Sequence, residues 1–190
     1  MSSEGFEQDL VKALSVVKSG GVILYPTDTI WGIGCDATDE KAVGRIFSIK
    51  NREDGKALIS LVDSLDTLKK WIVNIPTQAI AEIEATNEPL TIIFDSPRGI
   101  ASNLLAPDGS AAFRITSNPY AKELCRRLSK PLVSTSANIS QTPAPTDFKG
   151  ISPDILDSVD YIVEFGREDK GGKPSKILKI SDQGLIERIR

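Results

Sequence analysis

The chain of 190 residues, with 40% hydrophobic residues, is long enough for one globular domain with a core, and no second domain is expected. Its net charge of −3 argues against a protein whose whole surface binds nucleic acid, although a local basic patch is not excluded. The absence of histidine excludes Ser-His-Asp and Cys-His catalysis, histidine general bases and H-E-x-x-H zinc sites.

Two further features bear on the cellular setting. Cys35 and Cys125 are too few and too isolated for a cysteine zinc site or a disulfide framework, so buried free thiols are expected. The N-terminus is polar and acidic, and no apolar run approaches the roughly 18 residues of a membrane helix. We therefore expect a cytoplasmic protein with no membrane partner.

The first elements are a helix over 7–19 and a short buried strand over 22–25. Where the strand stops, residues 27–29 (Thr-Asp-Thr) place three oxygen-bearing side chains in succession. Gly32 and Gly34 follow, and they predict that the backbone passes close to another group.

A second helix is predicted over 39–50, and three cations stand where it ends: Lys50, Arg52 and Lys56. Cations are common at helix C-termini because of the helix dipole, which is one explanation. The apolar run over 57–62 returns directly afterwards, so the cations lie in a short connector between packed elements. A connector of this kind is also typical of a phosphate-binding site.

The rest of the chain alternates between helix and strand patterns. Helices are predicted over 64–71, 76–85, 119–128 and 151–158, and strands over 92–94, 111–115, 131–133, 161–165, 176–180 and 185–190. The fold class is therefore α/β, a twisted mixed β-sheet flanked by helices in a single domain. Two long connections are notable: 95–110, and the glycine-rich 166–174, which is either a mobile flap or a solvated loop.

Two sets of polar residues stand out in the second half. Arg114 lies inside an apolar strand, where an arginine needs an anionic partner, either a ligand or a structural carboxylate. Residues 134–138 (Ser-Thr-Ser-Ala-Asn) follow an apolar strand start, where ligands of α/β sheets bind, although serine and threonine also form ordinary turns.

These motifs resemble the Sua5/YciO/YrdC family, in particular its short YrdC-type threonylcarbamoyl-AMP synthases. The family's P-T-D-T-x-Y-G-L-G turn reads PTDTIWGIG over 26–34, its K-x-R reads Lys-Asn-Arg over 50–52, and its S-T-S-A-N signature is complete over 134–138. The resemblance covers nearly the whole chain, from about residue 16 onwards. It implies a YrdC-like fold, similar to that of dihydroxybutanone phosphate synthase, without the extra C-terminal domain of the longer Sua5 proteins.

The resemblance also implies an activity. Such enzymes condense L-threonine, bicarbonate and ATP, with Mg²⁺, into L-threonylcarbamoyladenylate and pyrophosphate. A downstream threonylcarbamoyl transferase complex uses the product to modify adenosine 37 of tRNAs. This reaction needs no enzyme nucleophile, because the threonine amine captures carbon dioxide and the carbamate attacks the α-phosphorus of ATP.

The resemblance assigns roles residue by residue, without a protein metal site. Lys50 and Arg52 are the expected catalytic residues. The expected ATP-binding residues are Lys50, Arg52, Lys56, Ser136, Asn138, Thr146 and an arginine near the C-terminus, Arg188 or Arg190. The expected threonine-binding residues are Thr29, Arg114 and Ser175.

Some residues depart from the family pattern, and they keep alternatives open. Leu61 stands where the family commonly has a histidine implicated in threonine binding, so a related enzyme acting on another amine also fits. A tRNA or double-stranded RNA binding protein is the other hypothesis, with phosphate contacts from basic residues of the helix over 119–128 and from Lys130.

Overall fold

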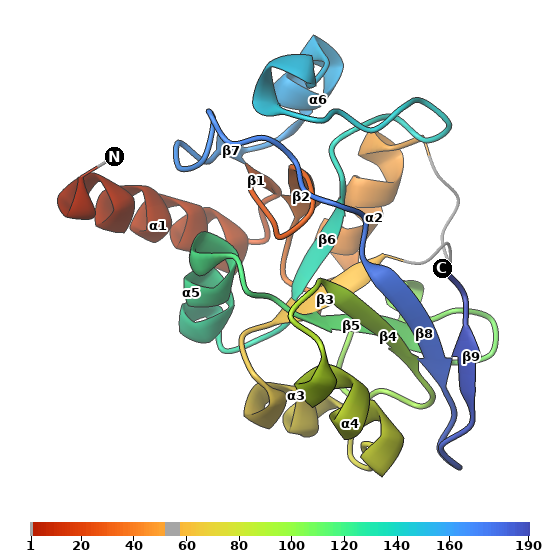
Figure 1. The fold of residues 1–190 in the computed structure, drawn as a ribbon. Coiled ribbons are helices and arrows are strands. Elements are labelled where there is room, and N and C mark those ends of the chain that lie inside the picture. The colour runs from red at the N-terminus through yellow and green to blue at the C-terminus, as the bar shows by residue number, and fades with distance from the viewer. Residues whose placement is uncertain (1, 52–57) are drawn as a thin grey trace.

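The computed structural model of the chain describes residues 2–51 and 58–190. In these residues the strands form one nine-stranded sheet in the order β7-β1-β2-β6-β3-β5-β4-β8-β9 (Figure 1). The pairs β1 with β7, β3 with β5 and β4 with β8 are parallel, and the other neighbours are antiparallel. Helices flank this mixed sheet, which confirms the predicted α/β class.

The helices and strands agree closely with the sequence patterns. The helices are α1 (Ser3–Lys18), α2 (Glu40–Ile49), α3 (Leu65–Trp71), α4 (Thr77–Ala85), α5 (Pro119–Leu128) and α6 (Pro153–Ser158), with 3-10 turns η1 (Ser102–Leu104) and η2 (Phe148–Gly150). The strands are β1 (Ile23–Tyr25), β2 (Gly32–Gly34), β3 (Ile59–Val62), β4 (Leu90–Phe94), β5 (Ala111–Ile115), β6 (Leu132–Ser136), β7 (Tyr161–Ile162), β8 (Lys176–Ile180) and β9 (Ile186–Arg188).

The differences from the predicted elements have local causes. Helix α1 begins four residues earlier than expected, because the Ser2 hydroxyl caps it by accepting a hydrogen bond from the Gly5 amide. The segment 32–34 is a strand, held by pairing with β1 on one side and β6 on the other. Strand β7 ends at Ile162 and not at residue 165, since the amides of Glu164 and Phe165 donate to the Asp9 carboxylate.

Helices α3 and α4 cover one face of the sheet formed by β4, β5 and β8. Phe94 and Phe113 point into this layer with their rings 6.4 Å apart, and Ile92 and Leu178 pack beside them. The alternate residues of the same strands, Thr91 among them, point to the opposite face. Strand alternation therefore leaves one face of this half of the sheet for packing and the other for a cavity.

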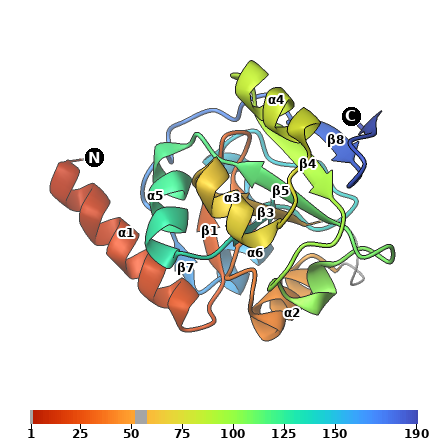
Figure 2. The ribbon, with the colours of Figure 1, turned by 90° about the horizontal axis from the view of Figure 1, so that it is seen from below.

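A larger core fills the space between the remaining helices and the strands β1, β2, β6 and β3. Helices α1 and α5 lie side by side at its edge (Figures 1 and 2). Phe6 of α1 contacts both Tyr120 and Phe165, with ring centroids 5.4 and 5.2 Å apart in edge-to-face geometry. These aromatic contacts join the two helices to the segment that follows β7.

The prediction that Gly32 and Gly34 allow a close backbone approach is confirmed at Gly34. A Cβ atom at this position would lie 2.6 Å from the ring of Tyr25, which no side chain tolerates. The Tyr25 hydroxyl in turn donates to the Val133 carbonyl at 3.0 Å. Glycine is therefore required for the tight packing of β1, β2 and β6.

Both cysteines are buried and free, as predicted, and burial raises the pKa of each thiol. Within residues 2–51 and 58–190, none of the helices combines the length and the apolar character needed to cross a bilayer.

The Asp9 carboxylate supports a prediction about stability. It is 2% exposed and accepts hydrogen bonds from the Tyr161 hydroxyl and from the amides of Glu164 and Phe165. Asp9→Ala removes the partner of these donors, so we expect the free energy of unfolding to fall by about 2–4 kcal/mol. Urea unfolding followed by circular dichroism measures this loss. Gln8→Ala, one residue away on the exposed face, is the control, and an equal effect of both changes would contradict the prediction.

Candidate functional site

The candidate site is a cavity of about 450 Å³ on the sheet face that α3 and α4 leave uncovered. Strands β2 to β6 and β8 contribute its floor, and the turn between β1 and β2 contributes one wall. The floor is apolar, with Ile59, Ile93, Ala112 and Ile177, while the polar groups converge from the rim. A cavity of this size with a few converging polar groups is typical of a small-molecule site.

Arg114 is a charged residue that lines the cavity. It is 4% exposed, and its guanidinium donates from Nε to the Thr91 hydroxyl and from Nη2 to the Ser175 hydroxyl, both at 3.1 Å. No carboxylate of the described chain lies within ion-pair distance of it. Burial lowers the pKa of Arg114, and the nearby negative charge of Asp28 partly opposes this shift. A buried guanidinium that binds only hydroxyl groups is suited to receive an anionic ligand.

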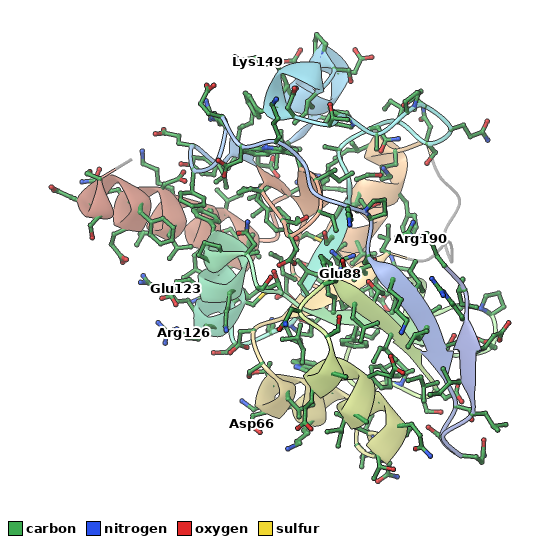
Figure 3. The ribbon with its side chains drawn as sticks, viewed as in Figure 1. Asp66, Glu88, Glu123, Arg126, Lys149 and Arg190 are labelled. Atoms are coloured by element: carbon green, nitrogen blue, oxygen red, sulfur yellow. The ribbon has the colours of Figure 1, made fainter. Side chains whose placement is uncertain are left out.

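A second guanidinium reaches the same point. Arg190 lies where β9 ends, beside the beginning of β8 (Figure 3). It donates from Nε to the Ser175 carbonyl at 3.1 Å and from Nη2 to the Ser175 hydroxyl at 3.3 Å. The positive charge of Arg190 further lowers the pKa of Arg114. Two like charges on one serine make this corner of the cavity electropositive.

The turn between β1 and β2 presents two threonine hydroxyls to the cavity. The Thr27 hydroxyl donates to the Ile30 carbonyl at 2.7 Å, and it lies 3.2 Å from both the amide and the hydroxyl of Thr29. Because the one hydroxyl proton of Thr27 is used on Ile30, Thr29 is the donor in the contact between the two threonines. The lone pairs of Thr29 are then left to accept from a ligand.

Strand β6 carries the Ser-Thr-Ser part of the 134–138 signature along the cavity. Ser134, Thr135 and Ser136 all line it. These residues are part of the strand itself and do not form a turn after it, because β2 and β3 pair with them on either side. The functional interpretation of this signature gains support from the position, since all three hydroxyl-bearing residues line the cavity.

Lys50 and Asn138 meet at the end of β6. Lys50 is 2% exposed, and its Nζ donates to the carbonyls of Ser136 and Asn138 at 2.6 and 2.7 Å. The side-chain amide of Asn138 donates from Nδ2 to the backbone carbonyls of Ile139 and Thr142. In this structure the two side chains therefore hold the backbone that follows β6, and neither lines the cavity within the described residues.

The expected site residues other than Lys50 and Asn138 fall into three groups. Thr29, Arg114, Ser175 and Ser136 line the cavity together. Thr146 is exposed and Arg188 lies on the exposed edge strand β9, so of the two C-terminal arginines it is Arg190 that reaches the cavity. The remaining two, Arg52 and Lys56, lie outside the described residues.

Sequence reasoning missed two cavity residues, Thr91 and Thr27. Thr91 is fully buried on β4, where it contacts both Arg114 and the Ser175 hydroxyl. The available signal was a threonine inside the apolar run over 90–94, the same kind of signal that singled out Arg114. Thr27 belongs to a quoted motif but was given no role.

Leu61 is the register partner of Arg114, so the two side chains point to the same face of the sheet, but Leu61 is buried in the core. It is fully buried, packs in the larger apolar cluster and is not among the cavity residues. The leucine therefore fills core space next to the strand that carries Arg114. Among the described residues, the cavity around Arg114 and Arg190 is lined by residues other than Leu61.

The segment 166–174 lies along the rim of the cavity. The Gly171 amide donates to the Thr146 carbonyl at 2.7 Å, and the Gly172 amide donates to the Thr29 carbonyl. A Cβ at Gly171 would lie 2.7 Å from the Thr146 carbonyl oxygen, so only glycine allows this approach. The segment then leads through Pro174 to Ser175, and both line the cavity. Whether it moves as a flap stays a prediction.

The basic residues proposed to contact RNA are mostly engaged with carboxylates. Arg126 pairs with Glu123 at 2.6 Å (Figure 3), Arg127 pairs with Glu7 at 2.5 Å and with Glu123 at 2.7 Å, and Lys130 pairs with Asp36 at 2.6 Å. Intramolecular pairing lowers the positive charge available for phosphates. The RNA hypothesis gains no support from this surface.

Among the residues that the structure describes, no three His, Cys, Asp or Glu side chains gather in a way that would hold a metal ion. The cavity lining likewise contains no carboxylate in these residues. The residues present therefore do not form a resident metal site at the cavity.

Comparisons with known proteins give a consistent result. Residues 15–190 match the model of the Sua5/YciO/YrdC family, which carries the description "Telomere recombination". A protein named putative threonylcarbamoyl-AMP synthase from Methanocaldococcus jannaschii is 35% identical, with 95% of this chain and 86% of that protein covered. The threonylcarbamoyl-AMP synthase of Xylella fastidiosa is 31% identical over 82% of this chain and 84% of its own length.

A solved structure is also similar. The crystal structure of P. abyssi Sua5 complexed with L-threonine superposes with a TM-score of 0.80 at 25% identity, over 92% of this chain. This chain spans about half of that Sua5 chain, 51% of its length.

The unpaired guanidinium of Arg114 leads to a prediction about stability. Arg114→Met removes a buried charge, while Thr91 and Ser175 remain hydrogen bonded to each other at 3.0 Å. We expect the free energy of unfolding without ligands to stay unchanged or to rise by up to about 2 kcal/mol. Urea unfolding measures it, and Arg127→Met, which breaks ion pairs, is the control expected to lower stability. A large loss of stability in Arg114→Met would show that the guanidinium is structural.

The ion pairs of Glu123 lead to a prediction about pH. Hydrogen bonds from Arg126 and then Arg127 lower the pKa of Glu123 to about 2, below the ordinary value of 4.5. Its contribution to stability is therefore fully present above about pH 4.5 and is lost as the pH falls toward 2. Its side chain is 25% exposed, so solvent keeps the effect small. Glu123→Gln should lower the urea midpoint at pH 7 and progressively less below pH 4.5, unlike the exposed control Glu84→Gln. A difference that is independent of pH would contradict the prediction.

Proposed function

Because the chain belongs to the Sua5/YciO/YrdC family, we propose that it is an L-threonylcarbamoyladenylate synthase, a nucleotidyltransferase that makes the activated intermediate for tRNA modification. The proposal rests first on the relatives, which are named threonylcarbamoyl-AMP synthases and are 31% and 35% identical over most of the chain. The observation that carries it in this structure is the electropositive corner at Ser175, where Arg114 and Arg190 converge.

The corner suits the carboxylate of an amino acid. Arg114 and Arg190 supply charge-assisted donors, and the burial of Arg114 makes its pairing stronger than it would be in water. Thr29, across the rim, offers a hydroxyl group for the polar side chain of threonine. The P. abyssi Sua5 structure contains L-threonine, and we propose the same amino acid as the substrate here.

In the proposed reaction the threonine amine adds to carbon dioxide, supplied by bicarbonate, and loses a proton to form a carbamate. A carbamate oxygen then attacks the α-phosphorus of ATP, and the bond from this phosphorus to the pyrophosphate oxygen breaks. The products are L-threonylcarbamoyladenylate and pyrophosphate. The chain needs no nucleophile or histidine base for these steps, so its contribution is positioning and stabilisation of charge.

The ATP side of the proposal rests on β6 and the residues after α2. Ser134, Thr135 and Ser136 offer hydroxyl and backbone groups along one wall, and Lys50 fixes the backbone where this wall ends. The catalytic roles of Lys50 and Arg52 remain predictions. So do the phosphate contacts of these two residues and Lys56, and the nucleotide contacts of Asn138 and Thr146. We propose that Mg²⁺ enters as the ATP complex, held by phosphate oxygens.

The expected cytoplasmic location and the downstream partners, tRNA and the transferase complex, also remain predictions. RNA binding is retained as the competing function. A steep decrease of RNA affinity with salt, together with absent ATP turnover, is the result that would favour it.

The decisive measurement is pyrophosphate release from ATP with Mg²⁺ and bicarbonate, with and without L-threonine. We expect threonine-dependent release, with the adenylate identified by mass spectrometry. Arg114→Met should lower kcat/KM for threonine by about 100-fold or more, because it removes a buried charge-assisted contact. Arg188→Met on the exposed strand β9 is the matched control and should retain wild-type activity.

Two results would contradict the proposal. ATP binding without stimulation by any amine would remove the synthase assignment. Stronger stimulation by serine or glycine than by threonine would indicate a related enzyme for another amine.

A further inference from the structure

The Asp28 carboxylate makes a connection that no strand pairing provides. Asp28 lies in the turn between β1 and β2, between the cavity residues Thr27 and Thr29. Its Oδ2 accepts from the Thr116 hydroxyl at 2.7 Å. Its Oδ1 accepts from the Ser117 amide, the Ser117 hydroxyl and the Asn118 amide at 2.6, 2.7 and 2.6 Å. Four donors thus converge on one side chain.

These donors belong to the chain directly after Arg114. Thr116 is two residues beyond it, and the Thr116 amide still donates to the Val62 carbonyl at 3.0 Å, which continues the pairing of β3 and β5. Thr116 is also 1% exposed, so this attachment point is fixed in the core. The carboxylate therefore holds the end of the strand that carries the guanidinium.

The connection spans the sheet. In the strand order, β6 and β3 lie between β2 and β5, so the β1–β2 turn and the end of β5 are not neighbours by backbone pairing. The hydrogen bonds of Asp28 tie these two segments directly to each other. Besides the hydrogen bonds of Asp28, two contacts hold Thr29. Its hydroxyl contacts the Thr27 hydroxyl, and its carbonyl accepts a hydrogen bond from the Gly172 amide.

We propose that Asp28 is a positioning residue that sets the separation between Thr29 and Arg114, and thereby the affinity for the amino-acid substrate. It does not line the cavity, and its oxygens are used by the four donors, so it acts through the residues on either side. The proposal rests on the proposed function for the identity of the substrate, although the tether itself does not.

The shape of the carboxylate and its charge are separable. Asp28→Asn keeps an oxygen in the position that accepts three hydrogen bonds, and its amide nitrogen is able to donate to the Thr116 hydroxyl, which then accepts. Asp28→Ala removes the whole tether. The asparagine variant therefore retains the tether and removes the charge, which makes it the conservative test.

The experiment measures L-threonine binding by titration calorimetry and the KM values for threonine and ATP in pyrophosphate release. We expect Asp28→Ala to weaken threonine binding and raise its KM by about tenfold or more, with the KM for ATP changed by less than about threefold. Asp28→Asn should stay within about threefold of the wild type. Asp36→Ala, which removes another largely buried carboxylate with several hydrogen bonds, lies outside the cavity and should leave both KM values unchanged.

Amide hydrogen exchange of the ligand-free protein tests the tether independently. Asp28→Ala should speed exchange in residues 27–31, and Asp28→Asn should not. If Asp28→Ala does not fold, Thr116→Val and Ser117→Ala test the same contact, because each removes a hydroxyl that donates to the Asp28 carboxylate. Each change should weaken threonine binding by about two- to fivefold.

Three results would overturn the inference. The first is wild-type threonine affinity in Asp28→Ala, and the second is an equal increase of the KM values for threonine and ATP. The third is threonine binding by Asp28→Asn as weak as that by Asp28→Ala, which would assign the effect to charge. Failure of the wild type to bind threonine would instead contradict the proposed function. The exchange data would then still decide whether Asp28 holds the turn.

Discussion

The buried guanidinium of Arg114 is the constraint on which the cavity depends. The Arg114 side chain is 4% exposed, and among the described residues its hydrogen-bond partners are hydroxyl groups. A buried charge of this kind is unfavourable in the ligand-free protein, and burial accordingly lowers the pKa of Arg114. The surrounding structure tolerates this because Thr91 and Ser175 satisfy part of its hydrogen bonding and also bind each other. In the proposed function, the carboxylate of the substrate supplies the missing negative charge, and the unfavourable burial of Arg114 then favours binding of an anion.

The same site is assembled from segments that are far apart in the sequence. Thr29 comes from the first hairpin, Arg114 from β5, Ser175 from the beginning of β8 and Arg190 from the end of β9. Backbone pairing alone does not set the separation between Thr29 and Arg114, since β6 and β3 lie between β2 and β5. Side chains that bind backbone, Lys50 at the end of β6 and Asp28 at the end of β5, hold the connections around the cavity. These two side chains therefore hold backbone segments that border the cavity.

The sequence predicted most helices and strands, because local patterns decide them. Asp39 accepts hydrogen bonds from the first amides of α2, and Ser64 caps α3, at the residues where these helices were predicted to begin. The errors occurred where distant residues intervene. Strand β2 exists because β1 and β6 pair with it, and β7 is short because Asp9 binds the amides that a longer strand would use.

For the site, the sequence by itself determined the chemistry: no histidine, a buried arginine, and hydroxyl-rich segments that resemble those of a known family. These properties follow from residue type and local order. Only the tertiary structure decided that Arg190 and not Arg188 reaches the cavity, that Thr91 joins it, and that Leu61 is buried in the core. It also placed Lys50 on the carbonyls at the end of β6. The physical reason is that the direction of a side chain depends on strand register and on contacts between distant segments, which no local pattern encodes.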